Sequence, residues 1–135
     1  MTRYLALLAL IPVVSILASG CGGPDRSALA KQRVVAYWTA IDHGKFASAY
    51  NMLSSGDRQS RDFGSYVSDM RGFLAQVAGL SVKTGKTTVS DDTAVVAVTL
   101  HSPLTSVPKH AYQHLYWNGN EWQITDLDGG LSDKP

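Results

Sequence analysis

The amino-acid sequence predicts an α+β fold in which helices pack on one face of a four-stranded antiparallel sheet. Between Leu29 and Leu74, apolar residues recur every three to four positions, which is the spacing of one helix face. After Gly79 they alternate with other residues at a period of two, which is typical of strands. Because the helical patterns all precede the strand patterns, the helices are expected to cover one side of the sheet.

Three helices are predicted, over residues 29–43, 46–53 and 63–74. Ser27 is suited to cap the first helix, and Gly44 to end it, so the first two helices should form an αα-hairpin. Residues 57–62 are polar and are interpreted as a loop or a helix start, with Asp62 or Ser65 capping the third helix. The helical spacing is carried by Ala30, Val34, Trp38 and Ile41, then Phe46, Tyr50 and Leu53, then Phe63, Val67, Met70 and Leu74.

Four strands are predicted, over residues 80–89, 93–101, 109–117 and 121–127. The second is rich in β-branched residues and gives the strongest strand signal. The connections carry turn chemistry: Ser-Asp-Asp at 90–92, two prolines within 102–108, and Asn-Gly-Asn at 118–120. This order predicts an antiparallel meander.

The N-terminus has the pattern of an export signal. Arg3 is followed by residues 5–17, which carry no charge, and the stretch is shorter than the roughly 20 apolar residues that span a bilayer. Ala18-Ser19-Gly20-Cys21 resembles the lipobox of bacterial lipoproteins, with Ala18 standing where Leu is usual. The resemblance implies that residues 1–20 are removed and that Cys21 is lipidated, with 21–27 as a flexible tether. An ordinary signal peptide and an uncleaved anchor are the alternatives.

Composition limits the partners of the remaining chain. The sequence holds 12 Lys and Arg and 11 Asp and Glu, so removal of Arg3 leaves 11 of each sign. No clustered basic run is present, which argues against nucleic acid as a partner. The acylated Cys21 is therefore the expected contact with the lipid membrane, and one cysteine excludes a disulfide within the chain.

Two stretches of the sequence resemble the nuclear transport factor 2-like superfamily, and most of all its small bacterial lipoprotein members. They are residues 40–50 (Ala-Ile-Asp-His-Gly-Lys-Phe-Ala-Ser-Ala-Tyr) and residues 117–124 (Trp-Asn-Gly-Asn-Glu-Trp-Gln-Ile). The resemblance covers residues 28–128 and leaves 129–135 as a loose tail. It implies a cone, in which three helices pack within a strongly bent sheet around a cavity. The superfamily includes enzymes and binding modules, so the fold alone does not give the function.

No catalytic residue, metal site or cofactor is predicted. Asp42 and His43 are adjacent at a helix end and point in different directions. His101 and His110 have no neighbouring carboxylate or thiol that would complete a metal site. The candidate ligand-contacting residues are Tyr50, Tyr112, His114, Tyr116 and Asp126.

Three of these candidates share one face of the third strand, because Tyr112, His114 and Tyr116 alternate with Ala111, Gln113 and Leu115. A histidine between two tyrosines on the concave face could contact a ligand or move a proton. The same stripe could equally be an aromatic outer face.

The predicted function is that of a membrane-anchored lipoprotein of the cell envelope, on the cell membrane or the outer membrane, that binds a partner protein or a small apolar ligand and is not an enzyme. One alternative is an isomerase- or dehydratase-like enzyme with its site in the cone, which needs at least two converging ionisable groups. The other is a structural accessory protein of the envelope, whose cone would be filled by its own side chains.

Overall fold

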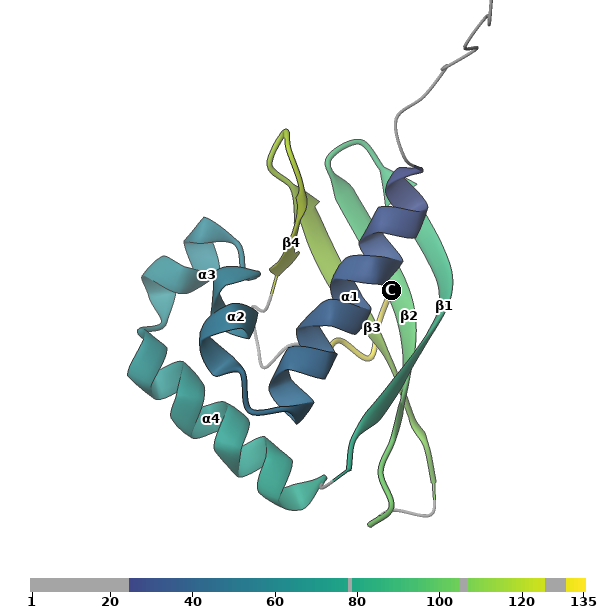
Figure 1. Ribbon diagram of the computed structural model, residues 1–135. Helices are drawn as coiled ribbons and strands as arrows, with labels where there is room; N and C mark the ends of the chain where they lie inside the picture. Colours follow the sequence, from purple (N-terminus) through teal and green to yellow (C-terminus); the bar gives the residue numbers. More distant parts are fainter. Residues whose placement is uncertain (1–24, 78, 105–106, 126–130) are drawn as a thin grey trace, which may run out of the picture.

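The computed structural model of the protein describes residues 25–77, 79–104, 107–125 and 131–135. The signal segment and Cys21 lie outside these residues. Helices precede strands, as the sequence predicts, and the chain runs once through each layer (Figure 1). The elements are α1 (Arg26–Asp42), α2 (Phe46–Asn51), α3 (Ser55–Ser60), α4 (Phe63–Gln76), β1 (Ser81–Ser90), β2 (Thr93–His101), β3 (Lys109–Trp117) and β4 (Trp122–Thr125).

Short side chains set where the longer helices begin. The Asp25 carboxylate accepts a hydrogen bond from the Ser27 backbone N–H at 3.0 Å, so α1 is capped by Asp25 and not by Ser27. Asp62 caps α4 as predicted, with its Oδ1 2.9 Å from the Ser65 backbone nitrogen. Gly44 has a φ of +70°, which a glycine adopts without strain, and it ends α1 before α2.

The prediction of three helices missed a fourth, α3, which forms over residues interpreted as the end of one helix and as a loop or the start of the next. Its sequence, Ser-Gly-Asp-Arg-Gln-Ser, has no apolar face that periodicity could detect. The helix is instead started by Ser54, whose hydroxyl accepts from the Asp57 backbone N–H at 3.3 Å. A short polar helix of this kind depends on its cap and on the elements around it.

The sheet is an antiparallel meander in the order β1-β2-β3-β4. The bounds of β2 and β3 are those predicted, and β1 is displaced by one residue. The described part of β4 ends at Thr125, whereas the prediction extended to residue 127, outside the described residues. Asp91 and Gly119 adopt φ angles of +51° and +96° in the two tight turns, where Asp and Gly are suited to such backbone.

We call the sheet face that turns toward α1 the inner face and the opposite one the outer face. Alternate residues of β2 and β3 are buried on the inner face, where α1 lies across the strands (Figure 1). Beyond β4, Leu53 forms a parallel bridge with Ile124, through Ser54 N–H to Ile124 O and Ile124 N–H to Met52 O, both at 2.8 Å. This bridge places the start of α3 beside β4.

The start of α1 is fixed to the end of the sheet that carries both tight turns (Figure 1). The Trp122 indole N–H donates to the Arg26 carbonyl at 2.8 Å. The Arg26 guanidinium lies 4.6 Å from the Trp117 ring centroid and 4.9 Å from that of Trp122, and 3.8 Å from the Asp92 carboxylate. Cation–π contacts of this kind hold the first helical turn against β3 and β4.

Candidate ligand-binding groove

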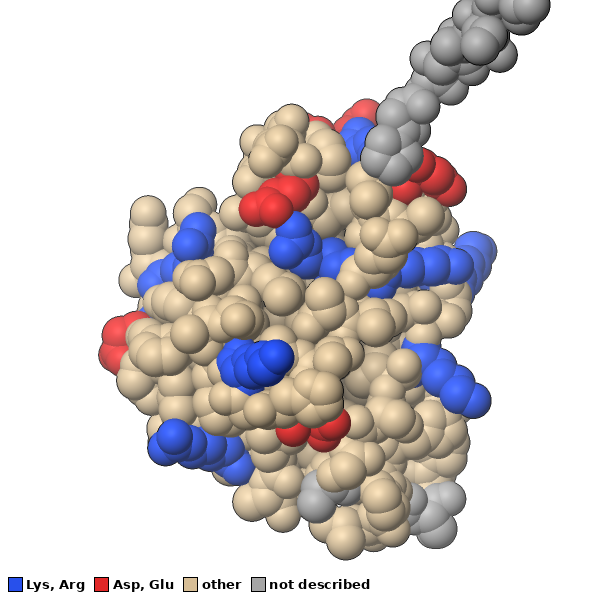
Figure 2. Space-filling model, in the orientation of Figure 1, with Lys and Arg blue, Asp and Glu red and all other residues tan. Residues whose placement is uncertain are grey.

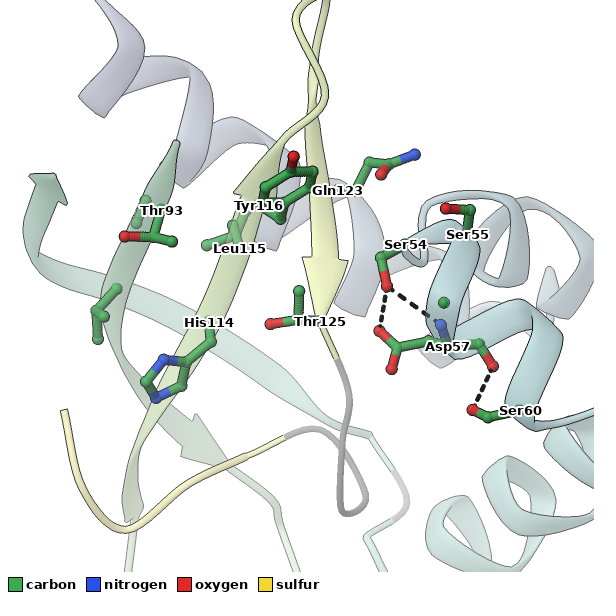
Figure 3. Close-up of a pocket in the computed structure, with 13 residues that line it drawn as sticks. Ser54, Ser55, Asp57, Ser60, Thr93, His114, Leu115, Tyr116, Gln123 and Thr125 are labelled. Atoms are coloured by element: carbon green, nitrogen blue, oxygen red, sulfur yellow. Dashed lines mark hydrogen bonds between the residues drawn. The ribbon is translucent and has the colours of Figure 1, made fainter. Parts of the chain in front are cut away.

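A hollow of about 730 Å³ opens between the outer face of the sheet and α3, and we call it the outer groove (Figure 3). It combines strand residues with the loop and helix that follow Leu53. Most of its lining side chains are small, hydroxyl-bearing or aromatic. The lining residues are Ser54, Ser55, Gly56, Asp57, Ser60, Thr93, Ala94, Val95, His114, Leu115, Tyr116, Gln123 and Thr125.

The sheet register arranges the floor of the outer groove in two rows across three strands. Tyr116 pairs with Thr93 on one side and with Gln123 on the other. His114 pairs in the same way with Val95 and Thr125. Because side chains two residues apart on a strand lie on the same face, the two rows form one continuous surface. Tyr116, with 44% of its surface exposed, is the large aromatic residue of this surface.

The wall formed by α3 is held by hydrogen bonds around Asp57, which is only 6% exposed. The Ser54 hydroxyl donates to Asp57 Oδ2 at 2.6 Å, and the Ser60 hydroxyl donates to the Asp57 carbonyl at 2.9 Å (Figure 3). Together with the N–H bond to Ser54, these contacts engage Asp57 in the helix cap. In Figure 3 its carboxylate and the His114 ring lie on either side of Thr125.

The inner face is packed with aromatic rings. The Trp38 indole N–H donates to the Gln113 side-chain oxygen at 3.2 Å, and both side chains are buried. The Tyr66 hydroxyl donates to that of Tyr37 at 3.1 Å. Phe73 packs on Trp38 with ring centroids 5.8 Å apart. Neutral hydrogen bonds therefore satisfy the polar groups that these large residues bring into the core.

The predicted stripe of Tyr112, His114 and Tyr116 lies on the outer face, because the alternate residues of β3 are buried against α1. Of the two interpretations of the stripe, the structure shows the outer face and not the concave one. The structure brings His114 and Tyr116 together in the outer groove, whereas Tyr112 is not among its lining residues.

The other two candidates lie apart from this stripe. The Tyr50 hydroxyl is 2.9 Å from the Arg58 carbonyl and 2.8 Å from the Arg61 carbonyl, and its ring packs on Phe63 and Tyr66. It thus joins α2 to the end of α3 in the helical layer. Asp126 lies outside the described residues. A ligand-contacting role stays a prediction for all five residues.

The C-terminal residues, predicted to form a loose tail, contact the outer face. Ser132 exchanges two backbone hydrogen bonds with Tyr112, at 2.9 and 3.0 Å. Farther along, the Lys134 carbonyl lies 3.3 Å from His114 Nε2. A carbonyl oxygen can only accept, so a hydrogen bond here requires a proton on Nε2. The tail therefore runs beside the outer groove and contacts one of its lining residues.

A smaller hollow of about 260 Å³ lies between the end of α1 and the start of β1, and Asp42 and His43 are among its lining residues. The two side chains are adjacent in sequence at the end of the helix. Within the described ranges, no three His, Cys, Asp or Glu side chains are gathered as a metal site would require. The outer groove, at about 730 Å³, is the larger of these two hollows and the better candidate for a ligand.

Sequence reasoning missed most of the lining of the outer groove. Thr93, Gln123 and Thr125 carry no recognisable motif, and Ser54 and Ser55 have the pattern of a helix end. The available signal was the register: once Asn118–Asn120 is taken as a tight turn, Tyr116 must face Gln123. The position of α3 could not be inferred in this way.

Charged side chains are scattered over the face shown in Figure 2, with basic and acidic groups interspersed among uncharged ones. Arg33 and Glu121 form an ion pair between α1 and the turn before β4. Among the described helices, none has the length and apolar character needed to cross a membrane.

Comparison with known proteins identifies the fold. No family model matches the sequence, and no curated protein matches it. A proposed NTF2-like transpeptidase from Campylobacter jejuni has a similar structure, with a TM-score of 0.55 and 10% identity, over 72% of this chain and 97% of that one. A proposed dehydratase of the NTF2-like family from Streptomyces avermitilis gives a TM-score of 0.53 and 13% identity, over 73% and 90%. The predicted α+β fold of nuclear transport factor 2-like type is thereby confirmed.

Proposed function

We propose that this chain is a lipid-anchored protein of the bacterial cell envelope whose domain binds a partner protein or a small apolar ligand and catalyses no reaction. The outer groove is the observation that carries the binding role, because it joins an accessible hollow to an exposed aromatic ring and uncharged hydrogen-bonding groups. The proteins of similar structure are described as a transpeptidase and a dehydratase, but identities of 10% and 13% transfer no activity.

The non-enzymatic part of the proposal rests on the ionisable groups of the outer groove. General acid–base catalysis needs titratable groups that converge on one reacting atom. Asp57 is bonded within the α3 cap. Its carboxylate and the His114 ring lie on either side of Thr125 (Figure 3), so they do not form a hydrogen-bonded acid–base pair.

The anchor rests on the sequence Ala18-Ser19-Gly20-Cys21 and on its distance from the domain. Asp25, the first described residue, already caps α1, so only three residues separate the cap from Cys21. Two or three acyl chains would hold such a chain firmly, at roughly 0.8 kcal/mol for each buried methylene.

Labelling with radioactive palmitate tests the anchor. The wild-type chain and Ser19→Ala, which keeps a small residue before the cysteine, should incorporate label and sediment with membranes. Cys21→Ala should do neither. Label that persists in Cys21→Ala, or an unlabelled wild-type chain, would contradict the anchor.

Crosslinking in intact cells tests the binding role. A photoreactive residue at Tyr116, inside the outer groove, should capture a protein or a small molecule. The same residue at Ser68, which is exposed on α4 and not part of the groove lining, is the matched control. Equal capture at both positions, or none at Tyr116, would contradict binding at the outer groove.

A further inference from the structure

The lining of the outer groove has the composition of a surface that recognises polypeptide. Protein interfaces are enriched in aromatic anchors and depleted in charge, and binding loops add Ser and Gly for adaptable hydrogen bonding. Here one exposed tyrosine shares the lining with serine, threonine and glutamine side chains, and no Lys or Arg is present. The one carboxylate of the lining, Asp57, is 6% exposed and bonded within the α3 cap. An anionic ligand would therefore meet no positive partner in the lining.

The floor of the outer groove offers both an apolar platform and hydrogen-bonding groups along its rim. The Tyr116 ring lies between Thr93 and Gln123 on the neighbouring strands. The Thr93 hydroxyl donates to the Ser90 carbonyl at 2.9 Å, so its oxygen can still accept a hydrogen bond from a ligand. An extended chain that laid one apolar side chain on Tyr116 would place main-chain N–H and C=O groups near these rim residues.

The C-terminal tail shows how a chain is held at this face. Leu131 packs against the core, Ser132 pairs with the Tyr112 backbone, and the Lys134 carbonyl meets the His114 ring. An extended segment thus already uses a main-chain carbonyl to contact a lining residue of the outer groove. The contact between His114 and Lys134 is one long hydrogen bond of 3.3 Å at an exposed site, so a second segment could replace it at small cost.

Resting on the proposed function, we infer that the ligand of the outer groove is an extended, uncharged peptide segment of a partner protein. The segment lies across Tyr116 with an apolar side chain, between the strand floor and the serine-lined wall of α3. Its main chain bonds to His114, through Nε2–H in place of the tail or through Nδ1 as an acceptor. The mode is main-chain recognition with one side-chain pocket.

Panning a random heptapeptide display library on the full chain, purified from membranes in detergent, tests this inference. Enriched peptides should be poor in Asp, Glu, Lys and Arg and should share one apolar position. A peptide recovered in this way should bind Tyr116→Ala at least tenfold more weakly, which corresponds to about 1.4 kcal/mol. Phe63→Ala, which removes an aromatic ring of the same exposure outside the lining, should change the affinity less than twofold.

Thermal unfolding of each variant distinguishes a loss of binding from a loss of folding. Because Tyr116 is exposed, its replacement by alanine should leave the domain folded. Enriched peptides that bind wild type and Tyr116→Ala equally would overturn the inference. Capture of only a small apolar molecule at Tyr116 in cells would also overturn it while leaving the proposed function standing. No capture at Tyr116 together with no enriched peptide would overturn both.

Discussion

At the scale of single residues, Gln113 shows how this core accommodates polarity. Its carboxamide is fully buried on the inner face, and its oxygen accepts the Trp38 indole N–H. Its nitrogen lies 3.4 Å from the Thr125 carbonyl, which is a weak contact. A buried amide in a row of apolar residues is tolerated because Trp38 brings a donor to it.

Breaking this pair from either side should destabilise the domain. Trp38→Phe leaves the Gln113 oxygen without its donor, and Gln113→Leu leaves the indole N–H without its acceptor, at about 1–3 kcal/mol each. The double variant removes both polar groups and should cost less than the sum of the two. Urea unfolding of the three variants measures the coupling, and strict additivity would show that the bond contributes nothing specific.

At the scale of elements, the cap of α4 links stability to pH. Hydrogen bonds from the Ser65 backbone N–H and then from its hydroxyl lower the pKa of the Asp62 carboxyl below its ordinary value. A lowered pKa in the folded state gives stability that is present above the unfolded pKa and lost as the pH falls through the folded one. Acidification should therefore weaken α4.

The variant Asp62→Asn isolates this effect, because Asn keeps an oxygen that can cap Ser65 and does not titrate in this range. The free energy of unfolding, measured from pH 6 to pH 2, should fall less steeply for Asp62→Asn than for wild type. Asp62→Ala should be less stable than both at pH 6. Parallel pH profiles for wild type and Asp62→Asn would show that the cap does not contribute to acid sensitivity.

Two glycines near the end of α4 should respond in opposite ways to alanine. Gly72 lies inside the helix with open space where a Cβ would stand, so Gly72→Ala should stabilise by up to about 1 kcal/mol. Gly79 has a φ of +73°, and a Cβ there would lie 3.1 Å from Pro103 Cγ, so Gly79→Ala should destabilise by more than about 1 kcal/mol. Thermal unfolding of both variants measures the change in stability. A change in the same direction for both would contradict the backbone conformations described for these two glycines.

The same elements show what the sequence could and could not predict. β2 and β3 were bounded correctly because β-branched runs between turn residues leave little freedom in register. The sequence could not show which face of the sheet carries Tyr116. Alternating residues define two faces, and only the position of α1 decides which of them is the inner face. The sequence did not predict α3 or the position of its serines. This helix forms through the Ser54 cap and the bridge to β4, and it has no apolar pattern that could reveal it.

At the scale of the whole molecule, the proposed anchor at Cys21 would give the domain a direction relative to the membrane. Five residues from Cys21 to Arg26 reach at most about 18 Å when extended. The start of α1 lies beside the turn at Asp92, whereas the 102–108 connection lies at the other end of nine-residue β2, about 30 Å away. The anchored domain should therefore hold its tight turns toward the bilayer.

Fluorescent probes test this direction. With Cys21 acylated, a cysteine introduced at Asp91 or at Leu104 is the reactive thiol to label. A quencher carried on lipid head groups should quench the probe at Asp91 more strongly than the probe at Leu104. Each labelled variant combined with Cys21→Ala is the control and should lose the difference. Equal quenching in the anchored chains would show that the domain has no fixed direction.

The contacts that fix the start of α1 also bear on when the domain can fold. Arg26 is held by Trp122, Leu53 by Ile124 and Trp38 by Gln113, so both layers are closed by residues from the end of the chain. Such distant pairings form late, because the intervening chain must first be ordered. A chain passing through a secretion channel N-terminus first would stay unfolded until nearly all of it had crossed. For a chain exported as proposed, this topology would keep the polypeptide unfolded, and so able to pass the channel, until its last strands had crossed.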